Sequence, residues 1–257
     1  MHKGQQNTEM GGARGSFPTT LWSEIGRSKT GDQANRMTLE NNLLQRYWKP
    51  VYCYLRRKGY KNEVAKDLTQ GFFHEIVLGY ELIQKADQTK GRFRTYLLTA
   101  LDRYIISIHR KETAKKRLPS GGIARLDTDS FPNIPAVEPK RSPEHAFHYT
   151  WAANILDRVL DELKDEYCST GRPTHWAVFH DRILMPIFDN TAETSLSDIC
   201  QEYGIETQKK AANMVITVKR RFASVLRRVL RQSVQSDDEV EEEIREFIQI
   251  LSNGGAA

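Results

Sequence analysis

The stretch from Arg92 to Arg117 constrains the fold most strongly, because its apolar residues recur at the spacing of a helix. These residues are Phe93, Leu97, Leu101, Tyr104 and Ile108. At about 3.6 residues per turn they lie on one side of the helix, and that side must face a core. The other side is polar, aromatic and basic, and it carries Tyr96, Thr99, Arg103, Ser107 and Arg110.

The residues alone leave two interpretations of this cationic side open. Cations neutralise phosphates, and an exposed aromatic ring can stack on an unpaired base, so the helix could lie along a nucleic acid. A solvated surface helix would have the same composition.

The chain as a whole has a modest basic balance. Its 257 residues carry a net charge of +5, which favours an anionic partner. Cys53, Cys168 and Cys200 are far apart, which excludes an ordinary disulfide framework or zinc finger and fits a reducing compartment. No apolar run approaches the ~20 residues of a membrane span, and the first residues lack an apolar signal core. We therefore expect a cytoplasmic protein without membrane insertion.

No sustained alternation of apolar and polar residues occurs, so we predict an all-α protein with two helical domains joined by a linker. The predicted divisions are a disordered N-terminus at 1–16, a first domain at 17–117, a linker rich in Pro, Gly and Ser at 118–142, a second domain at 143–235, and an acidic C-terminal helix and tail at 236–257.

Two further helices are predicted before Arg92. One follows Asp32, and Pro50 within it predicts a kink or a break. Its inner stripe is Leu39, Leu43, Tyr47, Val51 and Leu55. The next runs from about Asn62 to Leu78, with a stripe of Val64, Leu68, Phe72 and Ile76.

After the linker, Ser142 and Pro143 predict the start of a helix, and Gly171 predicts its end. Its apolar stripe runs from Ala152 through Ile155, Val159 and Leu163 to Tyr167.

The segment 195–231 predicts a helix-turn-helix, and the inner stripe of its long helix includes Ala211, Val215 and Val218. Ser195 and Thr207 stand at capping positions, and Gly204 provides the turn between a short helix and a long one. From Thr207 onward the segment has eight basic residues and no acid, which suits a helix that binds DNA. An ordinary helical hairpin remains the alternative.

The charge then reverses at the C-terminal end. Between Asp237 and Glu246, seven acidic residues accompany only one basic residue, Arg245. An apolar helical stripe nevertheless continues through Val240, Ile244, Phe247 and Leu251. We expect this helix to complete the core of the helical pair before it. A second hypothesis is that its acids lie near the basic face of that pair and compete with DNA.

No catalytic motif stands out in the chain. There is no P-loop, no GxSxG and no dinucleotide fingerprint. His145 and His148 can share a helix face but have no third ligand near in sequence. Asp67, His74 and Glu75 would suit a metal-dependent nuclease, yet Asp67 and Glu75 are eight residues apart, too far to chelate one ion unaided. We expect no enzyme, no cofactor and no metal site.

Three runs resemble the extracytoplasmic-function (ECF) group of bacterial RNA polymerase sigma factors. QRYWKPVYCYLRRKGYKNEVAKDLTQGFF is similar to their first conserved regions and contains the pattern D-L-x-Q-x-x-F. GRFRTYLLTAL is similar to their F-R-x-W-L region, with Tyr96 in place of the usual Trp. WAANILDRVLDELKDEY, followed by 195–231, is similar to their C-terminal domain. The acidic C-terminal helix looks like a feature of a longer subgroup.

The resemblance implies a sigma factor that binds RNA polymerase core and promoter DNA and directs promoter recognition. It leaves open whether an anti-sigma factor or another regulator is a further partner. The residues implied for core binding are Asp67, Gln70, Phe73 and Glu75. Those implied for the −10 element are Lys90, Arg92, Arg94, Tyr96, Arg103 and Arg110. Those implied for the −35 element are Thr207, Lys209, Lys210, Asn213, Thr217 and Arg220.

Two other function classes remain as alternatives. One is a two-domain DNA-binding regulator that acts without docking on polymerase, and the other is the metal-dependent nuclease. Arg103, Ser107 and Thr217 depart from residues common in the sigma family at these positions, which affects the individual promoter contacts.

Overall fold

The computed structural model describes residues 25–26, 28, 33–77, 81–87, 91–116, 142–232, 234 and 238–255. Within these residues every secondary-structure element is a helix, in agreement with the predicted all-α class. No helix in the described part of the chain is long and apolar enough to cross a membrane. The predicted disordered N-terminus, and the predicted linker up to residue 141, lie outside the described residues.

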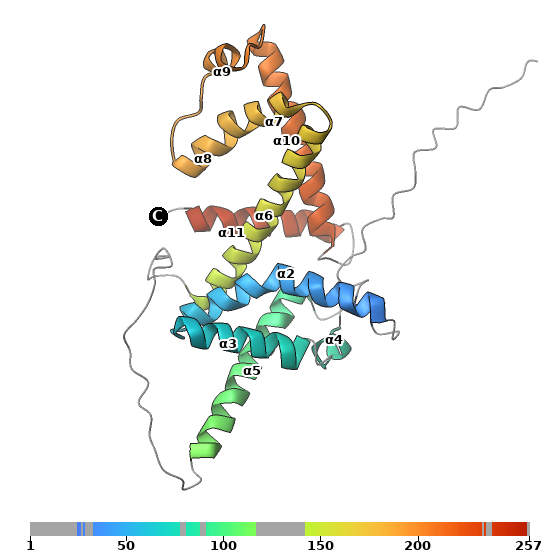
Figure 1. Ribbon diagram of the computed structural model, residues 1–257, viewed down its shortest axis with the longest axis vertical. Helices are drawn as coiled ribbons and strands as arrows, with labels where there is room; N and C mark the ends of the chain where they lie inside the picture. Colours follow the sequence, from blue (N-terminus) through green and yellow to red (C-terminus); the bar gives the residue numbers. More distant parts are fainter. Residues whose placement is uncertain are drawn as a thin grey trace, which may run out of the picture.

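The helices before the predicted linker form the lower group in Figure 1. They are α2 (Gln33–Arg57), α3 (Asn62–Phe72), the π-helical turn η1 (Phe73–Val77), α4 (Glu81–Lys85) and α5 (Phe93–Lys116). Helices α2 and α3 pack on each other, and the far half of α5 extends away from them (Figure 1).

The helices after the predicted linker begin with α6, which runs from the level of α2 up to α7 in Figure 1. They are α6 (Pro143–Ser169), α7 (Pro173–Phe179), the π-helical turn η3 (His180–Leu184), α8 (Met185–Asp189), α9 (Leu196–Tyr203), α10 (Gln208–Arg231) and α11 (Asp238–Gly255). Helix α6 packs on α2 near its start and on α7 and α10 further along, while α11 crosses it (Figure 1).

The predicted ends of α6 are confirmed. The Ser142 side chain accepts a hydrogen bond from the backbone N–H of His145 at 3.2 Å, and Pro143 occupies the first helical turn. Gly171, at φ 72°, follows the other end, where a left-handed residue stops a helix at little cost. The 27 residues between these signals span roughly 40 Å.

Most predicted apolar stripes are buried as expected. All five stripe residues of α2 are buried, and so are those of α6 from Ala152 to Tyr167. Of the kink or break expected at Pro50, the break does not occur, because α2 continues through this buried residue. Tyr47 and Val51 are buried on either side of Pro50, so packing offsets the hydrogen bond that proline cannot donate.

The predicted stripe of α3 is correct at Phe72 but lies one residue too early at Val64 and Leu68. The buried residues are Ala65, Thr69, Phe72 and Phe73, whereas Val64 and Leu68 are only partly buried. Ala65, Thr69, Phe72 and Phe73 recur at helical spacing, so the buried face of α3 continues into the π-helical turn that begins at Phe73. The side chain of Ile76 lies outside the described residues.

One hydrophobic core includes buried residues from both sides of the predicted linker. Tyr47 of α2 stacks on Phe147 of α6 with ring centroids 6.4 Å apart, and Tyr54 meets the same ring edge-on at 6.5 Å. The two groups of helices therefore share buried surface, and the domain boundaries stay a prediction.

Gly71 is required by a close approach between α3 and α5. A Cβ atom at this position would overlap the hydroxyl of Tyr104, which is itself buried, but would lie 3.6 Å from Cζ of the same ring. We expect Gly71→Ala to lower the free energy of unfolding by about 1–3 kcal/mol in the wild type. In a Tyr104→Phe background the same change should raise it by up to ~1 kcal/mol, because alanine is the better helix former. Urea denaturation of the four proteins tests this, and the same sign in both backgrounds would contradict the packing argument.

Candidate nucleic-acid interface

The turn between α9 and α10 is built from local signals. The Ser195 side chain accepts from the backbone N–H of Asp198 at 3.1 Å, and the Thr207 side chain accepts from that of Lys210 at 3.2 Å. Gly204, at φ 61°, ends α9 in the left-handed region. Both caps satisfy helix N–H groups that would otherwise lack partners, so the start of α10 is held in a defined orientation.

Helix α10 buries one face and exposes the other. Ala211, Val215 and Val218 are buried, as the stripe predicts. The exposed face, which we call the α10 outer row, consists of Thr207, Lys209, Lys210, Asn213, Thr217 and Arg220. Ile216, 45% exposed, adds an apolar contact beside this row. All six predicted −35 residues are thus accessible together on one helix face.

The second half of α10 is less available than its charge suggests. Arg221 pairs with Glu166 of α6, with an Nε–Oε2 distance of 2.9 Å. Arg228 pairs with Glu162 of α6, and Arg227 with Glu241 of α11. Lys209, Lys219 and Arg220 have no ion pair among the described residues. The accessible positive charge of α10 therefore lies mainly at and before Arg220, where Lys210 makes only an exposed pair with Glu206 at 3.6 Å.

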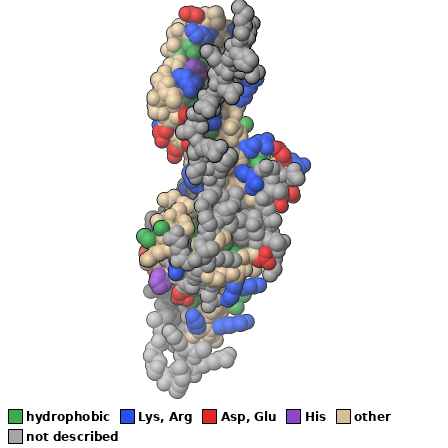
Figure 2. All heavy atoms as spheres, turned by 90° about the vertical axis from the view of Figure 1, so that its right-hand side faces the viewer, with side chains coloured by type: hydrophobic (Ala, Val, Ile, Leu, Met, Phe, Trp, Pro, Cys, Tyr) green, Lys and Arg blue, Asp and Glu red, His purple; other side chains and the backbone are tan. Residues whose placement is uncertain are grey.

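The exposed side of α5 forms a second basic surface. Thr99, Arg103, Ser107 and Arg110 are all exposed, as the helical spacing predicts. At the height of α5, Figure 2 shows Lys and Arg side chains on the surface. Tyr96 differs, because it is half-buried and its hydroxyl donates a hydrogen bond to the backbone carbonyl of Leu82 at 3.0 Å. Tyr96 thus ties α5 to α4, and Lys90 lies outside the described residues.

The two arginines at the start of α5 are engaged by α11. Arg94 is 2% exposed, and its guanidinium carbon lies 4.4 Å above the Trp151 ring. It pairs with Glu243, which is fully buried, and with Glu246 at 2.7 Å. Burial lowers the pKa of Arg94, and the neighbouring Glu243 carboxylate opposes that shift.

Arg92 contacts the same acidic residues from the outside. Its Nε lies 3.0 Å from Glu243, and its other nitrogens reach Glu242 at 3.8 Å and Glu246. On the face drawn in Figure 2, basic and acidic side chains gather together near mid-height, the level at which α11 lies in Figure 1. Glu241 of α11 pairs with Arg227 of α10, so the hypothesis of acids near the basic face of α10 describes this residue. Glu242, Glu243 and Glu246 instead contact Arg92 or Arg94 at the start of α5.

The residues implied for core binding divide into exposed and buried positions. Asp67 and Gln70 are exposed on α3, and Glu75 is exposed on η1. Phe73 is buried at 2% exposure and packs against Phe72 with ring centroids 5.6 Å apart. Phe73 can therefore position its neighbours but cannot reach a partner. His74 is also exposed, and no three His, Cys, Asp or Glu side chains converge as a metal site within the described residues.

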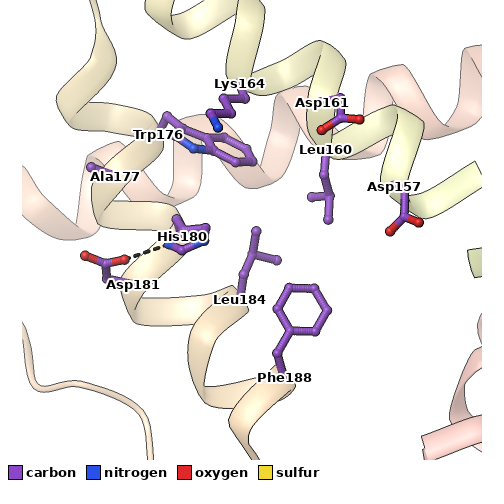
Figure 3. Close-up of a pocket in the computed structure, with 10 residues that line it drawn as sticks. All are labelled: Asp157, Leu160, Asp161, Lys164, Trp176, Ala177, His180, Asp181, Leu184 and Phe188. Atoms are coloured by element: carbon purple, nitrogen blue, oxygen red, sulfur yellow. Dashed lines mark hydrogen bonds and ion pairs between the residues drawn. The ribbon is translucent and has the colours of Figure 1, made fainter. Parts of the chain in front are cut away.

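A hollow of about 590 Å³ lies between α6 and the α7–α8 segment (Figure 3). Leu160, Leu184 and Phe188 line it, and Asp157 and Asp161 project from α6 (Figure 3). His180 Nδ1 lies 2.7 Å from Asp181 at another side of the hollow. No sequence motif marks this hollow, since its two walls come from helices separated by a turn.

No protein-family model, no curated protein and no solved structure matches this chain.

His148, near the start of α6, provides a test of the packing around these arginines. Burial lowers the pKa of His148 to about 4, and the charges of Arg94, His145 and Arg92 add to this effect against Glu144. An unfolded histidine has a pKa of about 6.5, so the unfolded chain binds the proton first. The stability that comes from this difference in pKa is complete above about pH 6.5. It is lost as the pH falls through the pKa of His148 in the folded protein.

We expect the free energy of unfolding, measured by urea denaturation, to fall from about pH 7 to about pH 5 in the wild type. In His148→Gln the fall should be smaller by about 1 kcal/mol, a value reduced for solvent screening because His148 is partly exposed. His175→Gln is the control, since the pKa of His175 is also lowered by burial but the residue lies beside Tyr167 instead. Equal pH dependence of His148→Gln and the wild type would show that His148 titrates as in the unfolded chain.

Proposed function

We propose that this chain is a sigma-type subunit that docks on RNA polymerase core and directs it to promoter DNA. The observation that carries the proposal furthest is the α10 outer row, which stands opposite a buried stripe on a capped helix of 24 residues. From Thr207 to Arg220 the row extends roughly 20 Å, a length that suits a helix lying in a major groove. The sequence resemblance to ECF sigma factors connects this surface with polymerase.

In this proposal α9 and α10 form a helix-turn-helix within a second domain, and α10 reads the −35 element. The Asn213 amide can both donate and accept toward a base edge, whereas Lys210 and Arg220 suit phosphates. The Thr217 hydroxyl donates to the Asn213 carbonyl at 2.8 Å, so it would meet DNA through its methyl group or as an acceptor. Thr207 and Lys209 lie at the start of the row and would contact the DNA backbone.

The helices before the linker would form the first domain, with two separate surfaces. Arg103 and Arg110 on the exposed side of α5 suit the phosphates of the −10 element, together with Lys90, Arg92 and Arg94 at its start. Asp67, Gln70 and Glu75 would dock on polymerase, and Phe73 would support them from the core. The two surfaces are carried by different helices, so they can be separated by mutation.

A DNA-binding regulator without polymerase docking is the second candidate, because the α10 outer row would serve it equally well. Binding of purified core polymerase by the chain distinguishes the two classes. Run-off transcription with core polymerase on a library of upstream regions then identifies the promoters. Binding of DNA without any binding of core would favour the regulator.

The α10 outer row predicts different roles for two residues one turn apart. Asn213→Ala should change the preferred −35 sequence and cost ~1–3 kcal/mol at one base pair, because a base-edge contact is lost. Lys210→Ala should weaken binding to all sequences and reduce the salt dependence by about one ion, because only a phosphate contact is lost. Binding measured across a set of −35 variants at several salt concentrations separates these effects. An unchanged sequence preference in Asn213→Ala would mean that another residue reads the base.

The exposed α3 residues predict a polymerase-binding defect. Asp67→Arg with Gln70→Ala should weaken core binding at least about tenfold while leaving helicity and duplex binding intact, since both side chains are exposed and lie on a helix apart from α10. Asp165→Arg, on the exposed side of α6, makes the same charge change elsewhere and should bind core normally. Normal core affinity of the Asp67/Gln70 variant would remove α3 from the docking surface.

A further inference from the structure

The start of α5 and the acidic helix α11 meet in one ion-pair cluster, made of Arg92, Arg94, Glu242, Glu243 and Glu246. Glu243 and Glu246 each contact both arginines, so two carboxylates are held between two guanidinium groups. Guanidinium groups bind the oxygens of a phosphate in the same forked way that they bind a carboxylate. The cluster is thus an anion site of Arg92 and Arg94, occupied by side chains of the same protein.

The cationic half of this site is held in place by contacts other than its acids. The Arg94 guanidinium stacks on Trp151, which belongs to α6 and is itself buried. Arg92 directly precedes α5, whose exposed cations Arg103 and Arg110 lie further along the same helix. An anionic chain that follows α5 could therefore use the exposed cations and the two clustered arginines in succession.

The acidic half is held partly by apolar contacts that are independent of the arginines. Phe247 of α11 meets the Trp151 ring edge-on with centroids 6.2 Å apart, and Val240 is also buried. The outer part of the cluster is open to water, with Arg92 at 28% and Glu246 at 34% exposure. Ion pairs removed from water gain little net stability, because desolvation offsets most of their attraction. Leaving the arginines without any anion would be costly, but another anion that takes the place of the carboxylates restores the attraction.

We propose that α11 competes within the molecule for the site of Arg92 and Arg94, and that nucleic-acid phosphates bind these arginines only when Glu243 and Glu246 leave it. This inference rests on the proposed function, since it assumes that α5 binds nucleic acid. It assigns the competition to α5 and not to the α10 outer row, because Glu242, Glu243 and Glu246 contact Arg92 or Arg94, whereas Glu241 pairs with Arg227, which lies outside that row. The free protein then holds single-stranded DNA weakly at α5, while the α10 outer row stays accessible.

The test compares variants of the full chain that carry the same change of charge. Glu243→Gln with Glu246→Gln keeps the side-chain shape but removes the charges that occupy the site. Glu239→Gln with Glu241→Gln changes two acids of the same helix that do not contact the arginines of α5. The probe is a fluorescent single-stranded DNA of about 20 nucleotides, which favours α5 over a duplex-reading surface. Circular dichroism and thermal unfolding verify that each variant is folded.

We expect the Glu243/Glu246 variant to bind the probe about tenfold more tightly than the wild type. A gain of this size corresponds to a wild type in which the acids have left the arginines in about a tenth of the molecules. The gain should shrink as salt rises from about 50 to about 300 mM, because fewer phosphate contacts survive. Adding Arg92→Gln should remove most of the gain. An equal gain in the Glu239/Glu241 variant, or no gain in a folded Glu243/Glu246 variant that still binds the probe, would overturn the competition and leave the proposed function standing.

Hydrogen exchange in the unmodified protein covers the case in which the glutamine variant does not fold. Saturation with the probe should raise exchange over 238–255, because α11 leaves α5, and should leave α9 unchanged. Binding of the probe without faster exchange in α11 would contradict the proposal. If neither the wild type nor any folded variant binds the probe, α5 is not a nucleic-acid surface, and the proposed role of α5 fails together with this inference.

Discussion

Both groups of helices are built on the buried face of α6. Phe147 near its start packs between Tyr47 and Tyr54 of α2, and Tyr167 near its end lies in the part that contacts α7 and α10. Burial of each large side chain along this face contributes roughly 1.5–3 kcal/mol, so the continuous stripe outweighs any single polar contact in the molecule. The distance between the lower group of helices and α10 follows from the length of this one helix, which packs on α2 near its start and on α10 further along.

Helix α11 is attached to this frame in two chemically different ways. Its apolar side meets α6 through Phe247 and Trp151, a contact that water cannot replace. Its acidic side meets Arg92 and Arg94, whose guanidinium groups can pair with another anion in place of the carboxylates. A helix with both kinds of attachment can lose its polar contact while the apolar contact limits how far it moves. This difference is the physical basis for treating α11 as more than a structural support.

The two basic surfaces differ in how their charges are used. On α10, carboxylates of α6 and α11 pair with arginines from Arg221 onward, so a DNA contact would be confined to the part of the helix up to Arg220. On α5, the far cations are exposed while those at the start are occupied. Under the proposed function, duplex contacts at α10 would need no rearrangement, whereas strand contacts at the start of α5 would. Duplex recognition would then precede strand capture for an electrostatic reason.

Local patterns in the chain were sufficient to predict the helices of α2, α5, α6, α10 and α11, and the caps at Ser142, Ser195 and Thr207. These features depend on residues within one or two turns of each other, so the chain alone determines them. The tertiary structure decided which charges are accessible. Arg94 looked like a surface cation but pairs with Glu243, 149 residues away. Phe73, expected on a docking surface, is buried in the core. Accessibility depends on which distant helices pack together, and such long-range contacts leave no mark in local spacing.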